Sequence, residues 1–167
     1  MRKAEMKRTT KETDIYISLN LDGGGKADIE SGIGFFDHML TLFTVHGDFD
    51  LTLRCKGDIE VDGHHSIEDI GILLGKCISE AVGDKKGIKR YSSATIPMDE
   101  SLCSTSIDVS GRPYLAYNAQ RLSNAFSNDF DYQLVEEFMR AVATNSGITL
   151  HINLLYGNNY HHMAESI

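Results

Sequence analysis

A five-residue pattern, His-His-x-x-Glu, occurs twice in this chain, at residues 64–68 and again 97 positions later at residues 161–165. The two copies hold four of the seven histidines. On a helix the first His lies four residues and the second His three residues before the Glu, so the three side chains project from one side. The repetition favours a fold in which two similar halves each build one such helix.

The two clusters are typical of a metal centre, because imidazole and carboxylate groups are common ligands of divalent transition ions. Adjacent histidines are about 100° apart around a helix, which makes it hard for both to reach one ion. We therefore expect each cluster to serve two ions. The candidate ligands are His64, His65, Glu68, His161, His162 and Glu165. Such ligands suit Mn, Fe, Co, Ni or Zn, and the sequence leaves the identity of the ion open.

Composition disfavours several classes of partner. The formal net charge of −8 argues against nucleic acid and anionic membranes, since both are bound by basic surfaces. The sequence has no apolar run of about 18 residues, the length that a membrane span needs. The charged first residues do not resemble a secretory signal. We therefore expect a cytoplasmic protein. Three cysteines without a C-x-x-C spacing predict core residues rather than disulfides or a thiolate zinc site.

A second repeat accompanies the clusters. Residues 36–40 read Phe-Asp-His-Met-Leu and residues 130–134 read Phe-Asp-Tyr-Gln-Leu. Each opens a stretch of helical period that ends at Gly47 or Gly147, with Asp37 or Asp131 as an N-terminal cap or first-turn acid. Alternating strands follow at residues 49–53 and 148–152, then a second short strand, a turn and the His-His-x-x-Glu helix. Each half is thus predicted to be a β-α-β-β-α-like unit.

Further patterns complete the predicted fold. Strands are expected at residues 14–21, 103–109 and 114–118, and a helix at 70–81 continues the first cluster. The fold class is α+β, with two duplicated halves, residues 1–86 and 87–167, in one compact domain. Each half is expected to have a sheet of about four strands with helices on one face. Because the second cluster is followed by two residues, too few for a helix with a buried face, we expect the natural chain to continue.

Five segments resemble the imidazoleglycerol-phosphate dehydratase family of histidine biosynthesis. They are GFFDHML at residues 34–40, DGHHSIED at 62–69, PMDE at 97–100, SGRPY at 110–114 and YHHMAE at 160–165. The resemblance runs from residue 11 to the chain end. It implies a fold like domain 2 of ribosomal protein S5, two Mn²⁺ per active site, and sites completed between subunits of a 24-subunit homo-oligomer. The implied activity is that of a hydro-lyase, the conversion of imidazole glycerol phosphate to imidazole acetol phosphate.

The resemblance also implies roles for single residues. His38 would be a seventh metal ligand, and Glu137, which stands where many members have a His, an eighth. His151, on the polar side of a strand, is the alternative to Glu137. The residues expected to move protons are Glu12, Glu68 and Glu165, and those expected to contact substrate are Glu12, His38, His46, Arg90 and Arg112, the two arginines at the phosphate. Asp99 and Glu100 match an acidic pair without an assigned role, and the family's C-terminal Lys and Ser-x-Lys contacts are absent from these residues.

The chemistry explains a need for metal. The proton that leaves is not activated by a carbonyl, so a Lewis acid on an imidazole nitrogen of the substrate is expected to stabilise the developing charge, with a glutamate as acid and base. Two other classes stay open at this point: a dimetal hydrolase that uses a bridging hydroxide, and a metal-binding shell protein without catalysis. Eight ligands for about twelve octahedral positions leave about four open, which favours catalysis.

Overall fold

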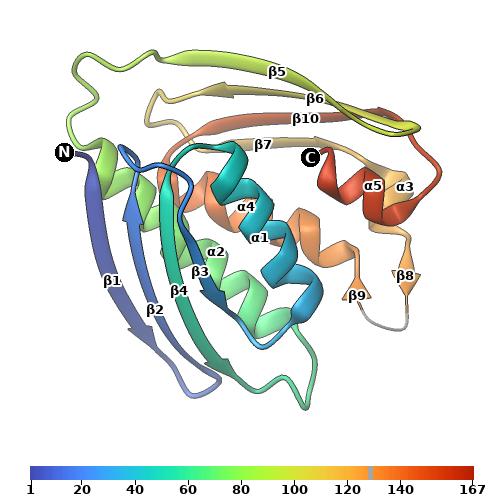
Figure 1. Ribbon diagram of the computed structural model, residues 1–167, viewed down its shortest axis with the longest axis horizontal. Coiled ribbons are helices and arrows are strands. Elements are labelled where there is room, and N and C mark those ends of the chain that lie inside the picture. Colours follow the sequence, from blue (N-terminus) through green and yellow to red (C-terminus); the bar gives the residue numbers. More distant parts are fainter. Residues whose placement is uncertain (128–129) are drawn as a thin grey trace.

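The computed structural model describes residues 1–127 and 130–167 and contains two four-stranded sheets with helices between them (Figure 1). The first half holds β1 (Lys3–Thr9), β2 (Thr13–Asn20), β3 (Ala27–Glu30), α1 (Gly34–His46), β4 (Asp50–Gly57) and α2 (His64–Val82). The second half holds β5 (Tyr91–Met98), β6 (Ser101–Asp108), β7 (Tyr114–Asn118), α3 (Gln120–Ser123), β8 (Phe126–Ser127), β9 (Phe130–Asp131), α4 (Gln133–Ser146), β10 (Thr149–Tyr156) and α5 (Tyr160–Glu165).

The strand order confirms the duplication. It is β1-β2-β4-β3 in the first sheet and β5-β6-β10-β7 in the second, so each strand of these two sheets has a counterpart in the other half. The last strand of each half, β4 or β10, runs antiparallel to one neighbour and parallel to the other. Two α+β halves with the same topology are therefore present, as predicted.

The predicted order of elements within each half was wrong. The common unit is β-β-β-α-β-α, to which the second half adds α3, β8 and β9. Among the residues that the structure describes, no separate short strand precedes either cluster helix, because β4 pairs with β2 over its whole length before the loop to α2 and β10 runs to Tyr156, just before α5. The prediction missed β5 because its residues before Met98 are all exposed, and it missed β1 because the inner face of that strand carries only Ala4 and Met6 as apolar residues.

The predicted helix ends at Gly47 and Gly147 are confirmed, since these glycines follow α1 and α4 directly. α2 also ends before a glycine, Gly83, and the φ angles of Gly83 and Gly147 are positive, at 59° and 71°. Asp37 lies in the first turn of α1, whereas Asp131 precedes α4 and accepts a hydrogen bond from the backbone N–H of Gln133. Among the predicted core cysteines, Cys77 and Cys103 are buried and Cys55 is half-buried.

The central contact of the molecule joins α2 of the first half to α4 of the second. Side chains of α2 that include Ile70 and Leu74 are buried, and this helix also packs on β1 and β2. Gly71 and Gly75 lie at the contact with α4. A Cβ atom at Gly75 would lie 2.8 Å from the backbone oxygen of Val142, so a side chain there would push the helices apart. Glycine thus allows the two halves to share one core.

The two halves differ in how their last helix covers the sheet. α2 spans 19 residues, whereas α5 has six and buries Met163. α5 contacts β5 and β6, and the residues of β5 before Met98 are exposed. In the part of the chain that the structure describes, no helix is long and apolar enough to cross a membrane.

Replacing Gly75 by Ala should lower the free energy of unfolding by about 1–3 kcal/mol, because overpacking against the α4 backbone outweighs the gain in helix propensity of about 1 kcal/mol. Gly34→Ala is the matched control, since it is also a helical glycine and a Cβ there meets no atom within 4 Å. Chemical denaturation measures both. Equal stability of Gly75→Ala and the parent protein would contradict the close-approach argument.

Candidate metal centre

The first cluster occupies the first turns of α2. The Asp62 carboxylate accepts a hydrogen bond from the backbone N–H of His64 at 2.8 Å and so orders the start of the helix. The spacing of four residues brings His64 Nε2 to 3.8 Å from Glu68 Oε2. Both side chains are about half exposed, so they are open to an ion or a partner.

The second cluster lies on α5 and has its own cap. The side-chain oxygen of Asn159 accepts hydrogen bonds from the backbone N–H groups of His161 and His162 at 2.9 and 3.3 Å. His161 Nε2 lies 3.3 Å from Glu165 Oε2, the same i,i+4 pairing as in the first cluster. The cap stabilises a helix that is too short to be stable on its own.

The adjacent histidines of each cluster point in different directions. The rings of His64 and His65 are 6.4 Å apart with an interplanar angle of 76°, and those of His161 and His162 are 6.3 Å apart at 87°. The divergence expected from helix geometry is therefore present in both halves. Each histidine of a pair can face a different ion.

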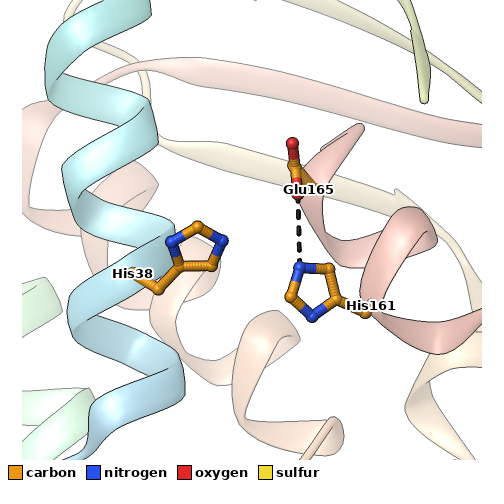
Figure 2. A group of neighbouring side chains, drawn as sticks. All are labelled: His38, His161 and Glu165. Carbon is orange, nitrogen blue, oxygen red and sulfur yellow. Dashed lines mark ion pairs between the residues drawn. The ribbon is translucent and has the colours of Figure 1, made fainter.

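Figure 2 shows that His38 of α1 faces His161 and Glu165 of α5. One ligand atom from each of these three residues lies within 4.8 Å of the others, and it is the one such group of three among the described residues. The Phe35 ring packs edge-on against the His161 ring at 5.4 Å and helps to fix its direction. A ligand group is thus built from both halves, with two nitrogen donors and one carboxylate.

The duplication relates α1 to α4 and α5 to α2. The counterpart of the group above would therefore combine Glu137 on α4 with His64 and Glu68 on α2. Glu137 is half-buried near the start of α4, but among the described residues these three do not form a group as close as the first. The chain by itself thus brings together one of two related ligand groups.

Each cluster also has a carboxylate behind its second histidine. Asp58 accepts from Nδ1 of His65 at 3.0 Å, and Glu100 from Nδ1 of His162 at 2.7 Å. These hydrogen bonds raise the pKa of both histidines, and the bond from His162, with backbone N–H groups of Asn159 and Asn158, lowers the pKa of Glu100. Sequence reasoning missed Asp58 and found no role for Glu100, because neither lies at a helical spacing from its histidine.

Glu12 lies in the turn between β1 and β2. The Thr10 hydroxyl accepts from the backbone N–H groups of Glu12 and Thr13, and the Thr13 hydroxyl donates to Asp69 at 2.6 Å. Asp69 follows Glu68 on α2, is buried, and also accepts from Arg8. The turn is thereby fixed to the helix of the first cluster. The Glu12 carbonyl also accepts from the backbone N–H of Asp58, whose carboxylate contacts His65, so the turn lies beside the first cluster.

Arg90 and Arg112, predicted to bind phosphate, converge on Asp108. Arg90 Nε donates to this carboxylate at 2.6 Å, and Arg112 Nη2 lies 3.8 Å from it. Lys85, just beyond α2, lies beside Gly111. This basic group is at the C-terminal end of α2, about 27 Å along the helix from His64. The cations and the clusters of one chain are therefore far apart.

The two other predicted histidines lie outside the ligand group. His46 is the last residue of α1, exposed and about 12 Å along the helix from His38. His151 lies on β10, exposed, with its ring 6.2 Å from that of Tyr114. Neither belongs to the group of three ligands.

Fold and site together define a duplicated α+β enzyme whose histidines and glutamates converge between its halves. The sequence model of imidazoleglycerol-phosphate dehydratase matches residues 31–167. The dehydratase of Alkaliphilus metalliredigens is 61% identical over 160 residues, which cover 96% of this chain and 82% of that protein. That of Syntrophus aciditrophicus is 56% identical over 167 residues, 100% of this chain and 85% of that protein.

Solved structures agree. The dehydratase of Staphylococcus aureus N315 superposes with a TM-score of 0.88 at 44% identity, covering 99% of this chain and 91% of that one. The Pyrococcus furiosus enzyme in complex with (S)-C348 has a TM-score of 0.79 at 34% identity, covering 96% and 85%. The chain belongs to the imidazoleglycerol-phosphate dehydratase family. It is a hydro-lyase of histidine biosynthesis, and the hydrolase and storage alternatives are set aside.

Proposed function

We propose that the chain removes water from imidazole glycerol phosphate to give imidazole acetol phosphate, and that it does so with two divalent ions, Mn²⁺ first among the candidates. The observation that carries the metal proposal is the group of His38, His161 and Glu165, whose ligand atoms lie within 4.8 Å of one another. Two imidazoles and one carboxylate suit a divalent ion that keeps open positions for a substrate. The three free cysteines fit a reducing compartment, and we propose the cytoplasm.

The reaction requires stabilisation of negative charge and movement of protons. A bound ion would supply Lewis-acid stabilisation of the charge that develops on the substrate's imidazole ring. Glu12 is suited to take or return a proton because its turn is fixed beside the first cluster. Glu165 and Glu68 lie within 4 Å of their cluster histidines and are the other candidates for this work. Arg90 and Arg112 would hold the phosphate by charge-assisted hydrogen bonds in exchange for Asp108.

The position of the arginines favours an assembled enzyme. Arg90 precedes β5 and Glu100 follows it, so this strand alone separates the phosphate-binding cations from the second cluster by about 24 Å. A single small substrate cannot span that distance. We therefore propose that Arg90 and Arg112 serve the metals of a neighbouring subunit, in a homo-oligomer of 24 subunits. Ligands from a neighbour would also complete the group of His64, Glu68 and Glu137.

Replacing His38 by Ala should lower Mn²⁺ occupancy and abolish dehydration, because the candidate metal site loses one of its three ligands. His46→Ala is the matched control for occupancy, since it removes a histidine of the same helix outside the ligand group. Elemental analysis and a dehydratase assay measure both effects, and chelation followed by Mn²⁺ should remove and restore activity of the parent protein. Full activity of a metal-free preparation would refute the metal proposal.

Glu137→Gln should lower metal occupancy, whereas His151→Ala should leave it nearly unchanged. The reason is the relation between α1 and α4 in the duplicated fold: Glu137 is the fifth residue of α4, as His38 is the fifth residue of α1. Metal titration of the two purified variants separates the assignments. Loss of an ion in His151→Ala with normal occupancy in Glu137→Gln would reverse them.

Shared sites can be tested by complementation. Arg90→Ala and Glu165→Gln should each inactivate the enzyme, but coexpressed chains should recover about a quarter of parental turnover, because some sites then join an intact Arg90 to an intact Glu165. Coexpression of either variant with the double variant is the control and should recover nothing. If mixed assemblies form without regaining activity, both residues act within one chain and the proposed arrangement is wrong.

A further inference from the structure

The carboxylates of Asp58 and Glu100 contact Nδ1 of His65 and His162 directly. Resting on the proposed metal function, we propose that Glu100 and Asp58 are positioning residues that fix the tautomers of His162 and His65, so that Nε2 of each ring is left to bind an ion. An ionised carboxylate can only accept a hydrogen bond. In the neutral ring that meets it, Nδ1 must then carry the proton and Nε2 the free lone pair.

Glu100 is itself held in place. Its Oε2 atom accepts from His162 Nδ1, while its Oε1 atom accepts from the backbone N–H groups of Asn158 and Asn159 at 3.0 and 2.7 Å. Asn159 is the cap of α5. The turn between β5 and β6 therefore fixes both the start of the helix and the ring on its first turn. Each oxygen of Glu100 has a separate partner, so the carboxylate has little freedom to turn.

In the first half Asp58 orients His65 as Glu100 orients His162, but Asp58 lies in the loop between β4 and α2. Both carboxylate oxygens lie close to His65 Nδ1, at 3.0 and 3.2 Å, and the backbone N–H of Asp58 donates to the carbonyl of Glu12 at 3.1 Å. The Asp58 side chain is 22% exposed, so bulk water competes little for it. The loop before α2 thus orients His65 while it is tied to the β1–β2 turn.

The duplicated topology allows the turns that carry Glu12 and Glu100 to be compared directly. The turn that carries Glu12, between β1 and β2, is the counterpart of the turn that carries Glu100, between β5 and β6. Glu100 uses its carboxylate to hold His162. Among the described residues the carboxylate of Glu12 has no hydrogen-bond or ion-pair partner, and in this half Asp58 is the residue that contacts His65 Nδ1. The same turn therefore supplies a positioning residue in one half and a carboxylate available for proton transfer in the other.

The Glu100→Gln variant tests the tautomer directly. The amide oxygen should stay with the backbone N–H groups of Asn158 and Asn159, which turns the amide NH₂ toward His162. Nδ1 then has to accept, and the ring changes to the Nε2–H tautomer. We expect this change in solid-state ¹⁵N spectra of metal-free, histidine-labelled protein at alkaline pH, with the His162 signals identified by their loss in His162→Gln. Mn²⁺ affinity should fall about 10–100-fold.

Asp99→Asn is the matched control. Asp99 lies in the same turn, and its carboxylate is 3.9 Å from Nε2 of His162 rather than at Nδ1. Asn tolerates the positive φ of this position, so the turn should be preserved. This variant should keep the Nδ1–H tautomer. Asp58→Ala is a second test, in the first half. In this variant His65 should shift toward the Nε2–H tautomer.

The possible outcomes distinguish the positioning role of Glu100 from the proposed metal function. An Nε2–H tautomer of His162 in the parent protein, or an unchanged tautomer in Glu100→Gln, would overturn the positioning role. Normal tautomers in a parent protein that binds no Mn²⁺ would instead overturn the metal function and leave the hydrogen-bond argument intact. A changed tautomer with undiminished Mn²⁺ affinity would show that Glu100 does not prepare His162 for an ion.

Discussion

The close contact between α2 and α4 is the constraint on which the site depends. Gly71 and Gly75 place no side chain between the helices, so their backbones approach and one core serves both halves. At the start of α2, Gly63 lies against Ile33, just before α1, and Leu134 of α4. The first turns of three helices thereby meet at the end of the molecule where the histidines lie. A wider spacing of α2 and α4 would move apart the two halves that carry His38 and the pair His161 and Glu165.

The candidate ligand group combines residues from both halves. His38 comes from the first half, and His161 and Glu165 come from the second. Neither half could form this group alone, which gives the duplication a chemical consequence beyond the shared fold. Lys85, Arg90 and Arg112 lie near the C-terminal end of α2, whereas the His64 and Glu68 cluster lies at its start.

The two halves show how equal topology can support unequal chemistry. The β1–β2 and β5–β6 turns occupy equivalent places, yet Glu100 is committed to His162 and to the backbone before α5. In the first half the corresponding work falls to Asp58, and the turn of Glu12 is fixed instead through Thr13 and the buried Asp69. The position of a carboxylate relative to Nδ1, rather than its place in the repeat, decides whether it orients a ring or stays available to a substrate.

Sequence alone determined the duplication, the family, the α+β class and the helical placement of both clusters, because these depend on local spacing and on motifs that are repeated or specific. It did not determine the order of elements in each half, since β5 is exposed without alternation and the inner face of β1 has only two apolar residues. The tertiary structure decided which residues meet: His38 with His161 and Glu165, Asp58 with His65, and Glu100 with His162. These partners are seven or more positions apart or lie on separate elements, and only the packing of α1, α2, α4 and α5 brings them together.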